Sequence, residues 1–202
     1  VRVGLRSEDP TEGIKRPKLK STGFYTWTED DIARFETVHH IGTRARLAMS
    51  LGLYTGQRRC EILSLGRQHV RDGLVHLRQG KTGKTLAIPV HPDLQAVLDA
   101  VPLDQLTFIT TVHGKPFDPM AFSTWFKSEC QKAGLPQGAT FHGLRKAASR
   151  RLAEAGCSAN VIQAITGHAS LKEVARYTAA ADQLRLAQLG IQSIGRTKKW
   201  QT

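Results

Sequence analysis

The amino-acid sequence predicts a mostly α-helical fold with one small antiparallel β-sheet. Several segments repeat apolar residues every three or four positions, which is the spacing of an amphipathic helix. Two neighbouring segments, 74–78 and 85–90, alternate instead, and they flank the turn sequence QGKTGK. The chain has 202 residues and 40% hydrophobic content, which suffices for a single globular domain with a sizeable core.

The opening of the chain differs from the rest. Residues 1–22 are rich in Lys, Arg, Pro and Gly and have no clear periodicity, so we expect a basic linker or arm. A solvated tail and a contact with a DNA backbone both remain open for this segment. Because the first residue is Val1 rather than Met, we also expect the chain to be a fragment.

Two helices are expected in residues 28–56. The first begins at Thr28, a typical N-cap, with Trp27 before it as a hydrophobic staple. The second begins at about Thr43 and ends at Gly56, since glycine commonly ends helices. The residues expected on their apolar faces are Ile32, Phe35, Val38, Leu47, Leu51 and Tyr54.

A β-hairpin, a short strand and two more helices are expected next. Leu86, Ile88 and Val90 alternate as a half-buried strand does, and Gly83 suits the positive φ of a tight turn. A helix should begin at His91, a short strand should cover 106–110, and a further helix should begin near Asp118. The last of these carries apolar residues expected in the core or an interface, namely Met120, Phe122, Trp125 and Phe126.

The segment from Phe141 to Tyr177 carries an unusual set of polar side chains. His142 and Arg145 are three residues apart in a helix-forming run, so they leave the same helical face. An apolar-periodic helix then leads to Gly167-His168. Ser170, with Glu173 three residues later, has the pattern of a capping box for a short helix that carries Tyr177.

These side chains suit attack on a phosphodiester. A guanidinium fork and imidazole donors match the charge that develops on the non-bridging oxygens of a phosphate in transfer. A phenol is a plausible nucleophile, and its product would be a phosphotyrosyl ester. Free tyrosine has a pKa near 10, so only about one molecule in a thousand is ionised at neutral pH. We therefore expect cationic neighbours or a base beside Tyr177.

The composition indicates a nucleic-acid partner. A net charge of +12 and an isoelectric point near 10.1 favour a polyanion, nucleic acid before a membrane surface. No apolar run approaches the roughly 18 to 20 residues of a membrane span, so no membrane partner is expected. Cys60, Cys130 and Cys157 are widely spaced and include no C-x-x-C pair, which is typical of thiols in a reducing compartment and suggests no zinc.

The order of these motifs resembles the tyrosine recombinase (phage integrase) family. The resemblance rests on H-x-x-R at residues 142–145, Gly-His at 167–168, a tyrosine nine residues later, and TGQRRCEI at 55–62. It covers roughly residues 24–180 and implies that family's catalytic domain, with the DNA breaking-rejoining fold, over residues 23–180. It also implies that an N-terminal core-binding domain is absent, and that residues 181–202 form a C-terminal helix or tail that docks in cis or in trans.

The resemblance implies a role for each matched residue. Tyr177 would attack a DNA phosphodiester, giving a 3′-phosphotyrosyl link and a free 5′-hydroxyl. His142 would take the tyrosine proton or hydrogen-bond the phosphate. Lys81, preferred over Lys84 on the hairpin, would protonate the leaving oxygen. The residues expected to hold the non-bridging oxygens are Arg58, Arg145 and His168, with Glu61 in support.

By the same resemblance the reaction needs no cofactor, no metal and no external energy. The sequence has Thr166 where the family commonly has Leu, and Ala179 where a His often follows the tyrosine. We expect neither departure to touch a catalytic group.

The implied partners are double-stranded DNA and further copies of the chain. A tetramer on DNA is expected from the family, with the fragment alone as a possible monomer, and accessory DNA-bending proteins as possible partners. The expected location is cytoplasmic, with the nucleoid, in a bacterial or phage context. The residues expected to contact the DNA backbone are Lys84, Lys146, Arg150 and Arg151.

Three other functions remain open. Residues 158–177 resemble a helix-turn-helix, so the chain could be a non-catalytic DNA-binding module, but that leaves Arg58, Lys81 and the H-x-x-R pair unexplained. A metal-dependent nuclease using His142 and His168 would need clustered carboxylates, which the sequence lacks. A type IB topoisomerase shares the recombinase chemistry, and only resemblance separates the two.

Overall fold

A computed structural model describes residue 13 and residues 23–102 and 105–194 of the chain. The predicted arm over 1–22 therefore lies, apart from Gly13, outside the described residues. The architecture is mostly α-helical with one three-stranded antiparallel sheet, which confirms the predicted fold class. In chain order the elements are α1 Glu29–Val38, α2 Arg44–Thr55, α3 Arg59–Ser64, a 3₁₀ turn Arg67–His69, β1 Val70–Arg71, β2 Leu74–Arg78, β3 Thr85–Pro89, α4 Pro92–Asp99, α5 Pro119–Lys132, α6 Phe141–Glu154, α7 Ala159–Thr166 and α8 Leu171–Ile194.

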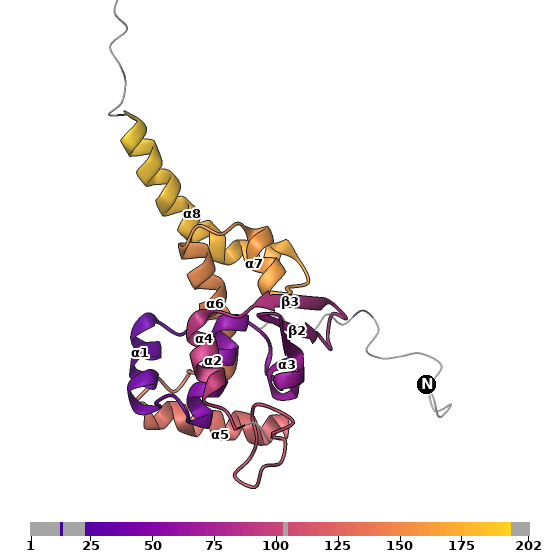
Figure 1. The fold of residues 1–202 in the computed structure, drawn as a ribbon. Coiled ribbons are helices and arrows are strands. Elements are labelled where there is room, and N and C mark those ends of the chain that lie inside the picture. The colour runs from indigo at the N-terminus through magenta and orange to yellow at the C-terminus, as the bar shows by residue number, and fades with distance from the viewer. Residues whose placement is uncertain (1–12, 14–22, 103–104, 195–202) are drawn as a thin grey trace, which may run out of the picture.

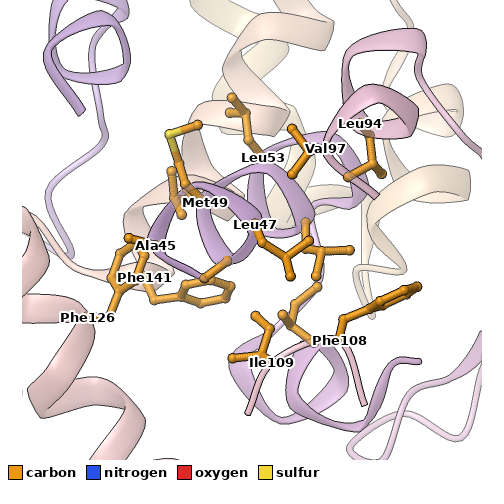
Figure 2. Close-up of a cluster of buried hydrophobic side chains, with 14 of the residues drawn as sticks. Ala45, Leu47, Met49, Leu53, Leu94, Val97, Phe108, Ile109, Phe126 and Phe141 are labelled. Carbon is orange, nitrogen blue, oxygen red and sulfur yellow. The ribbon is translucent and has the colours of Figure 1, made fainter. Parts of the chain in front are cut away.

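Helix α2 lies in the middle of the fold (Figure 1). It begins after the N-cap Thr43 and ends at Gly56, whose φ of 63° is left-handed, both as predicted. Nine of its twelve residues are buried, because α4 and α6 pack against different sides of it. Figure 2 shows its side chains meeting those of α4, α5, α6 and the 108–109 segment in one apolar core. A methyl group on Gly52 would lie 2.8 Å from Cζ of Phe141, so this glycine permits the close approach of α6.

Helix α1 begins where the capping pattern predicts. Thr28 and Asp31 form a complete capping box, and Trp27 packs against Phe35 with ring centroids 5.3 Å apart. The prediction that Val38 faces the core was wrong, since Val38 is 47% exposed. The helix ends there, and the next residue, His39, is the one whose ring contacts Phe35, at 4.3 Å.

The β-hairpin is confirmed, with Val75 opposite Ile88 and Gly83 in the turn at a φ of 69°. The two-residue strand β1 was not predicted. The predicted strand over 106–110 was wrong, because only Thr110 pairs, in an isolated bridge with Pro116. Phe108 and Ile109 of this segment enter the core instead of extending the sheet, and Leu106 is 76% exposed.

An aromatic cluster supports the beginning of α6. Phe122 and Phe126 of α5 are fully buried, and each makes an edge contact with Phe141 at a centroid distance of 5.2 or 5.3 Å. Met120 of the same helix was predicted to be apolar core or interface, and it is 72% exposed. Because Phe141 is the first residue of α6, this cluster fixes the position from which the H-x-x-R motif starts.

Helix α8 is one continuous helix of 24 residues, so the predicted short helix around Tyr177 was wrong. The three alanines that follow Thr178 have high helix propensity, and no Gly or Pro interrupts the helix before Gly190. The expected domain boundary at residue 180 therefore falls inside a helix, whose second half extends away from the other elements (Figure 1). In this second half Ala187 and Ile191 are exposed, and the side chains of Leu184 and Ile194 lie outside the described residues.

No helix in the described part of the chain is long and apolar enough to span a membrane.

We expect Phe122→Ala to lower the free energy of unfolding by about 3–5 kcal/mol, because it removes a fully buried ring and leaves a cavity. Urea denaturation followed by circular dichroism measures the change. Met120→Ala is the matched control in the same helix, and its effect should stay within about 0.5 kcal/mol. Equal losses from the two variants would contradict the burial pattern of α5.

Candidate active site

Arg145 is the most enclosed cation of the site. Its side chain leaves α6, is 3% exposed, and donates from Nη1 to the carbonyl oxygens of Gly56 at 2.8 Å and Thr166 at 2.6 Å. These carbonyls stand at the C-terminal ends of α2 and α7, where helix dipoles favour a cation. The Nη2 atom is buried and has no hydrogen-bond partner. Half of the guanidinium is therefore fixed by backbone, and the other half is available.

Arg58 supplies a second guanidinium with an available donor. It is the N-cap residue of α3, directly after the Gly56 turn that ends α2. Its Nη1 atom is buried, makes no hydrogen bond, and lies 3.9 Å from Oε1 of Glu61. Burial and the charge of Arg58 lower the pKa of Arg145 to about 10, so Arg145 stays charged at neutral pH. Two adjacent cations with unpartnered donors make a site for an oxyanion.

His168 is held in one tautomer by its neighbours. It is 8% exposed, and its Nδ1 atom lies 2.6 Å from the Thr166 hydroxyl. That hydroxyl donates its own proton to the carbonyl oxygen of Ile162 at 2.7 Å, so it must accept from Nδ1–H. Burial first, then Arg145 and Arg58, lower the pKa of His168 to about 4. At neutral pH the ring is therefore neutral, with an unprotonated Nε2.

Thr166 consequently contacts two of the predicted catalytic residues. Its hydroxyl accepts from His168, and its carbonyl accepts from Arg145. The expectation that this departure from the family pattern touches no catalytic group was wrong. The turn geometry is the reason, because the left-handed Gly167 brings residues 166 and 168 to the same side of the chain.

Tyr177 and His142 complete the group predicted from the motifs. The Tyr177 ring, on α8, is half-buried and its centroid lies 6.5 Å from that of His168. Burial raises the pKa of Tyr177 and outweighs the lowering by Arg145 and Arg176. The expected cationic neighbour is present, yet the phenol is neutral at neutral pH. His142 is exposed at the beginning of α6, beside the Phe24 ring at 4.4 Å, and partial burial and Arg145 lower its pKa.

The hairpin places its two lysines differently. Lys84 donates from Nζ to the carbonyl oxygen of His168 at 2.8 Å, so it reaches the site. Lys81 is exposed on the turn and makes no hydrogen bond or ion pair with the described residues. The structure thus joins Arg58, His142, Arg145, His168 and Tyr177, and it leaves Lys81 on the adjoining turn.

Two buried glutamines tie the hairpin to the site, and sequence reasoning missed both. Gln79 is fully buried and donates from Nε2 to Oε1 of Gln57 at 2.6 Å and to the carbonyl oxygen of Thr166 at 2.9 Å. A methyl group on Gly167 would lie 2.4 Å from the same Nε2 atom, so Gln79 fills the space that this glycine leaves. The one available signal was that Gln57 stands between the helix-ending glycine and Arg58.

Most of the predicted DNA-contacting cations have partners within the protein. Lys146 donates to the carbonyl oxygen of Phe24. Arg150 and Arg151 both pair with Glu29, and these contacts lower the pKa of Glu29 to about 2. Their contact with the DNA backbone stays a prediction.

No group of three or more His, Cys, Asp or Glu side chains in the described ranges is arranged to hold a metal ion.

The chain is similar in sequence to proteins of known function. Residues 27–184 match the model of the phage integrase family. The integrase of Escherichia phage HK022 is 33% identical over 189 residues, which are 88% of this chain and 53% of that protein. The shufflon-specific DNA recombinase of Escherichia coli is 29% identical over 185 residues, 88% of this chain and 46% of that protein. The chain thus spans about half the length of these relatives.

Solved structures share the architecture. A λ integrase dimer bound to a COC′ core site superposes with a TM-score of 0.67 at 27% identity, covering 79% of this chain and 49% of that one. The XerA recombinase superposes with a TM-score of 0.70 at 22% identity, covering 86% of this chain and 66% of that one, and so shows the fold alone.

We expect Thr166→Val to release His168 from its single tautomer, because the variant lacks the acceptor for Nδ1–H. Nitrogen-15 NMR at pH 7 should show an unprotonated Nε2 in the parent and a mixture of tautomers in the variant. Thr178→Val is the matched control, since Thr178 is also buried but bonds only within its own helix. The same tautomer in Thr166→Val as in the parent would mean that another group sets it.

The low pKa of His168 also predicts a loss of stability in acid. Its pKa falls from 6.5 in the unfolded chain to about 4 in the folded protein, so between these values only the unfolded chain binds the proton. The contribution of this residue to folding should therefore be intact above pH 6.5 and decline as the pH falls toward 4. Urea titrations of the parent and of His168→Gln at several pH values measure it, and an unchanged difference across this range would contradict it.

Proposed function

The chain belongs to the phage integrase family of tyrosine recombinases, and from that premise we propose that it cleaves and rejoins DNA strands through a 3′-phosphotyrosyl intermediate. The observation that carries the proposal is the pair of unpartnered buried donors, Nη1 of Arg58 and Nη2 of Arg145, beside His168 and Tyr177. A buried donor without a partner costs about 1–3 kcal/mol. A phosphate in this position would satisfy both arginines at once, and its phosphorus would stand within reach of a tyrosine.

The proposed reaction exchanges one phosphodiester for another. The Tyr177 oxygen attacks phosphorus, the bond from phosphorus to the 5′ oxygen breaks, and the tyrosine proton passes to His142. Lys81 gives a proton to the departing 5′ oxygen. Attack by the 5′-hydroxyl of another strand on the phosphotyrosine reverses the step. Because the ester bond is conserved throughout, the cycle needs no external energy source.

Phosphate binding should change the charge state of His168. The pKa of this ring is low because it is buried between cations, and an incoming anion favours its protonated form. Protonated His168 keeps Nδ1–H on Thr166 and gains an Nε2–H that can donate to a non-bridging oxygen. Arg58, Arg145 and His168 would then surround the phosphate with three cationic groups, which supports stabilisation of its developing charge.

The proposed partners are duplex DNA and further copies of the chain. Related structures include the λ integrase dimer on its core site and a λ integrase tetramer bound to a Holliday junction, at 27% and 29% identity. Assembly of this chain on DNA, docking of its tail on a neighbour and help from accessory DNA-bending proteins are parts of the same proposal. The proposal also includes a location with bacterial or phage DNA. It further includes contacts with the DNA backbone by Lys84, Lys146, Arg150 and Arg151.

We expect Tyr177→Phe to bind DNA about as well as the parent but to form no covalent adduct, because only the nucleophilic oxygen is removed. A denaturing gel of a labelled, nicked duplex detects the adduct. Tyr54→Phe is the matched control, since the Tyr54 hydroxyl donates to Asp93 away from the site. An adduct with Tyr177→Phe, or one lost with Tyr54→Phe, would show that the nucleophile is misassigned.

We expect Lys81→Ala to slow cleavage of normal DNA by about two to four orders of magnitude, the usual contribution of a general acid. The variant should regain most of its rate on a substrate with a bridging 5′ sulfur, because a thiolate leaves without a proton. Single-turnover rates on the two substrates measure the rescue.

Arg58→Ala and Arg145→Ala are the controls for this rescue. Both should stay slow on either substrate, since sulfur does not replace a contact with a non-bridging oxygen. Rescue of Lys84→Ala instead of Lys81→Ala would identify Lys84 as the acid, in keeping with its contact to His168. With no rescue in either lysine variant, the acid lies elsewhere.

A further inference from the structure

A cleft of about 680 Å³ opens directly beside the candidate active site. Arg58 and His142 form the end of the cleft at the site. From there it runs between the beginning of α3 and the face of α5 that carries Thr124 and Lys127. The cleft is therefore continuous with the position proposed for the phosphate under attack.

The cleft is positively charged, and one of its cationic side chains has no partner among the described residues. Arg58, Arg59 and Lys127 line it, and no Asp or Glu is among its lining residues. Arg59 is held in the wall by a hydrogen bond to the Ser123 hydroxyl. Lys127 is exposed and makes no hydrogen bond or ion pair with the described residues. Arg150 and Arg151, in contrast, are already paired with Glu29.

The lining groups suit a sugar–phosphate backbone better than base edges. Thr124 and Lys127 are three residues apart on α5, so a hydroxyl and an ammonium follow each other on one face of the helix. Such side chains commonly bind phosphate oxygens. The exposed Phe24 ring also lines the cleft and offers apolar surface to deoxyribose.

The position of the hairpin decides which side of the broken bond enters the cleft. Gln79 and Lys84 bind residues 166 and 168 after α7, and no hairpin residue lines the cleft. The leaving 5′ oxygen must lie near the lysine that protonates it, on the hairpin side. The other ester oxygen of the phosphate belongs to the strand whose 3′ end stays with Tyr177, so a cleft without hairpin residues suits that strand.

We propose that this cleft binds the backbone phosphates on the 5′ side of the cleaved bond, in the strand that remains attached to the protein. This inference rests on the proposed function and adds the path of the retained strand. Lys127 and Arg59 would hold that strand while the other one departs. The cleft would keep the phosphotyrosyl end in place for the next 5′-hydroxyl.

Substrates that contain only the retained strand test the proposal. A duplex whose 3′ end carries a p-nitrophenyl phosphodiester reacts with Tyr177 to give the same phosphotyrosyl link. The released p-nitrophenolate is followed by absorbance and needs no proton from the hairpin. The half-saturating DNA concentration and the limiting rate of a single turnover are measured for strands of one, two, four and eight nucleotides.

The expected result is that Lys127→Ala weakens DNA binding more as the strand becomes longer. With eight nucleotides, Lys127→Ala should raise the half-saturating concentration about tenfold, the value of one charged hydrogen bond to phosphate. With one nucleotide there is no upstream phosphate, so the loss should be much smaller. Lys132→Ala is the matched control, because Lys132 is on the same helix, pairs with Glu129 and does not line the cleft. A length-independent loss, or an equal loss in the control, overturns the proposal.

The binding of DNA to the Tyr177→Phe variant tests the contribution of the cleft separately from the cleavage reaction. Duplexes ending in a 3′-phosphate and extended upstream should lose affinity in Lys127→Ala, and the slope of log K against log salt should fall by about 0.9. Sensitivity only to duplexes extended on the 5′-hydroxyl side would reverse the assignment. If the parent releases no p-nitrophenolate, the proposed function fails, while this binding series still decides the path of the strand.

The exposed thiol of Cys60, which lines the same cleft, provides a second readout. DNA that carries an activated mixed disulfide (a 2-pyridyl disulfide) on a tether at one upstream phosphate should exchange with the Cys60 thiolate of the parent, releasing 2-thiopyridone, and Cys60→Ser should abolish the cross-link. Cross-linking only with downstream tethers overturns the proposal.

Discussion

The site depends on two helix ends that share one guanidinium. Helices α2 and α7 each end at a glycine in the left-handed region, and the carbonyls at these ends accept hydrogen bonds from the same Nη1 of Arg145. The dipoles of both helices favour the cation and reduce the free-energy cost of burying it. Arg58 follows the first helix end, and His168 follows the second. Moving either end would displace a catalytic candidate together with its support.

The rest of the fold keeps these ends at a fixed separation. Helix α2 is buried on nearly every side, and the aromatic cluster of α5 holds the beginning of α6. Gln79 and Gln57 then connect the sheet to both helix ends through hydrogen bonds in a buried region. Buried cationic donors that make no hydrogen bond lower the stability of the folded state. The packing and hydrogen bonds around the site must offset that cost.

The fold class and the helix ends could be predicted because caps, glycines and hydrophobic periodicity act locally, and the five clustered site residues were predicted from the resemblance of their motifs to a family. Thr28 is an N-cap, Gly56 ends a helix and Gly83 adopts the positive φ of a turn, as expected for these residue types. Contacts between distant segments were not predictable in this way. The roles of Gln79 and Thr166 depend on tertiary packing, and so does the exposure of Val38. The uninterrupted α8 was missed because the boundary was inferred from resemblance instead of the helix propensity of its alanines.

The unpartnered donors of Arg58 and Arg145 have a consequence for solution conditions. Small oxyanions such as phosphate and sulfate have the geometry of the transferred group, whereas chloride does not. At equal ionic strength, a phosphate buffer should therefore compete with DNA more strongly than a chloride buffer does. It should also raise the melting temperature of the protein, because a ligand of the native state stabilises that state by mass action. The identity of the buffer anion should thus affect the protein separately from the general screening of its positive charge.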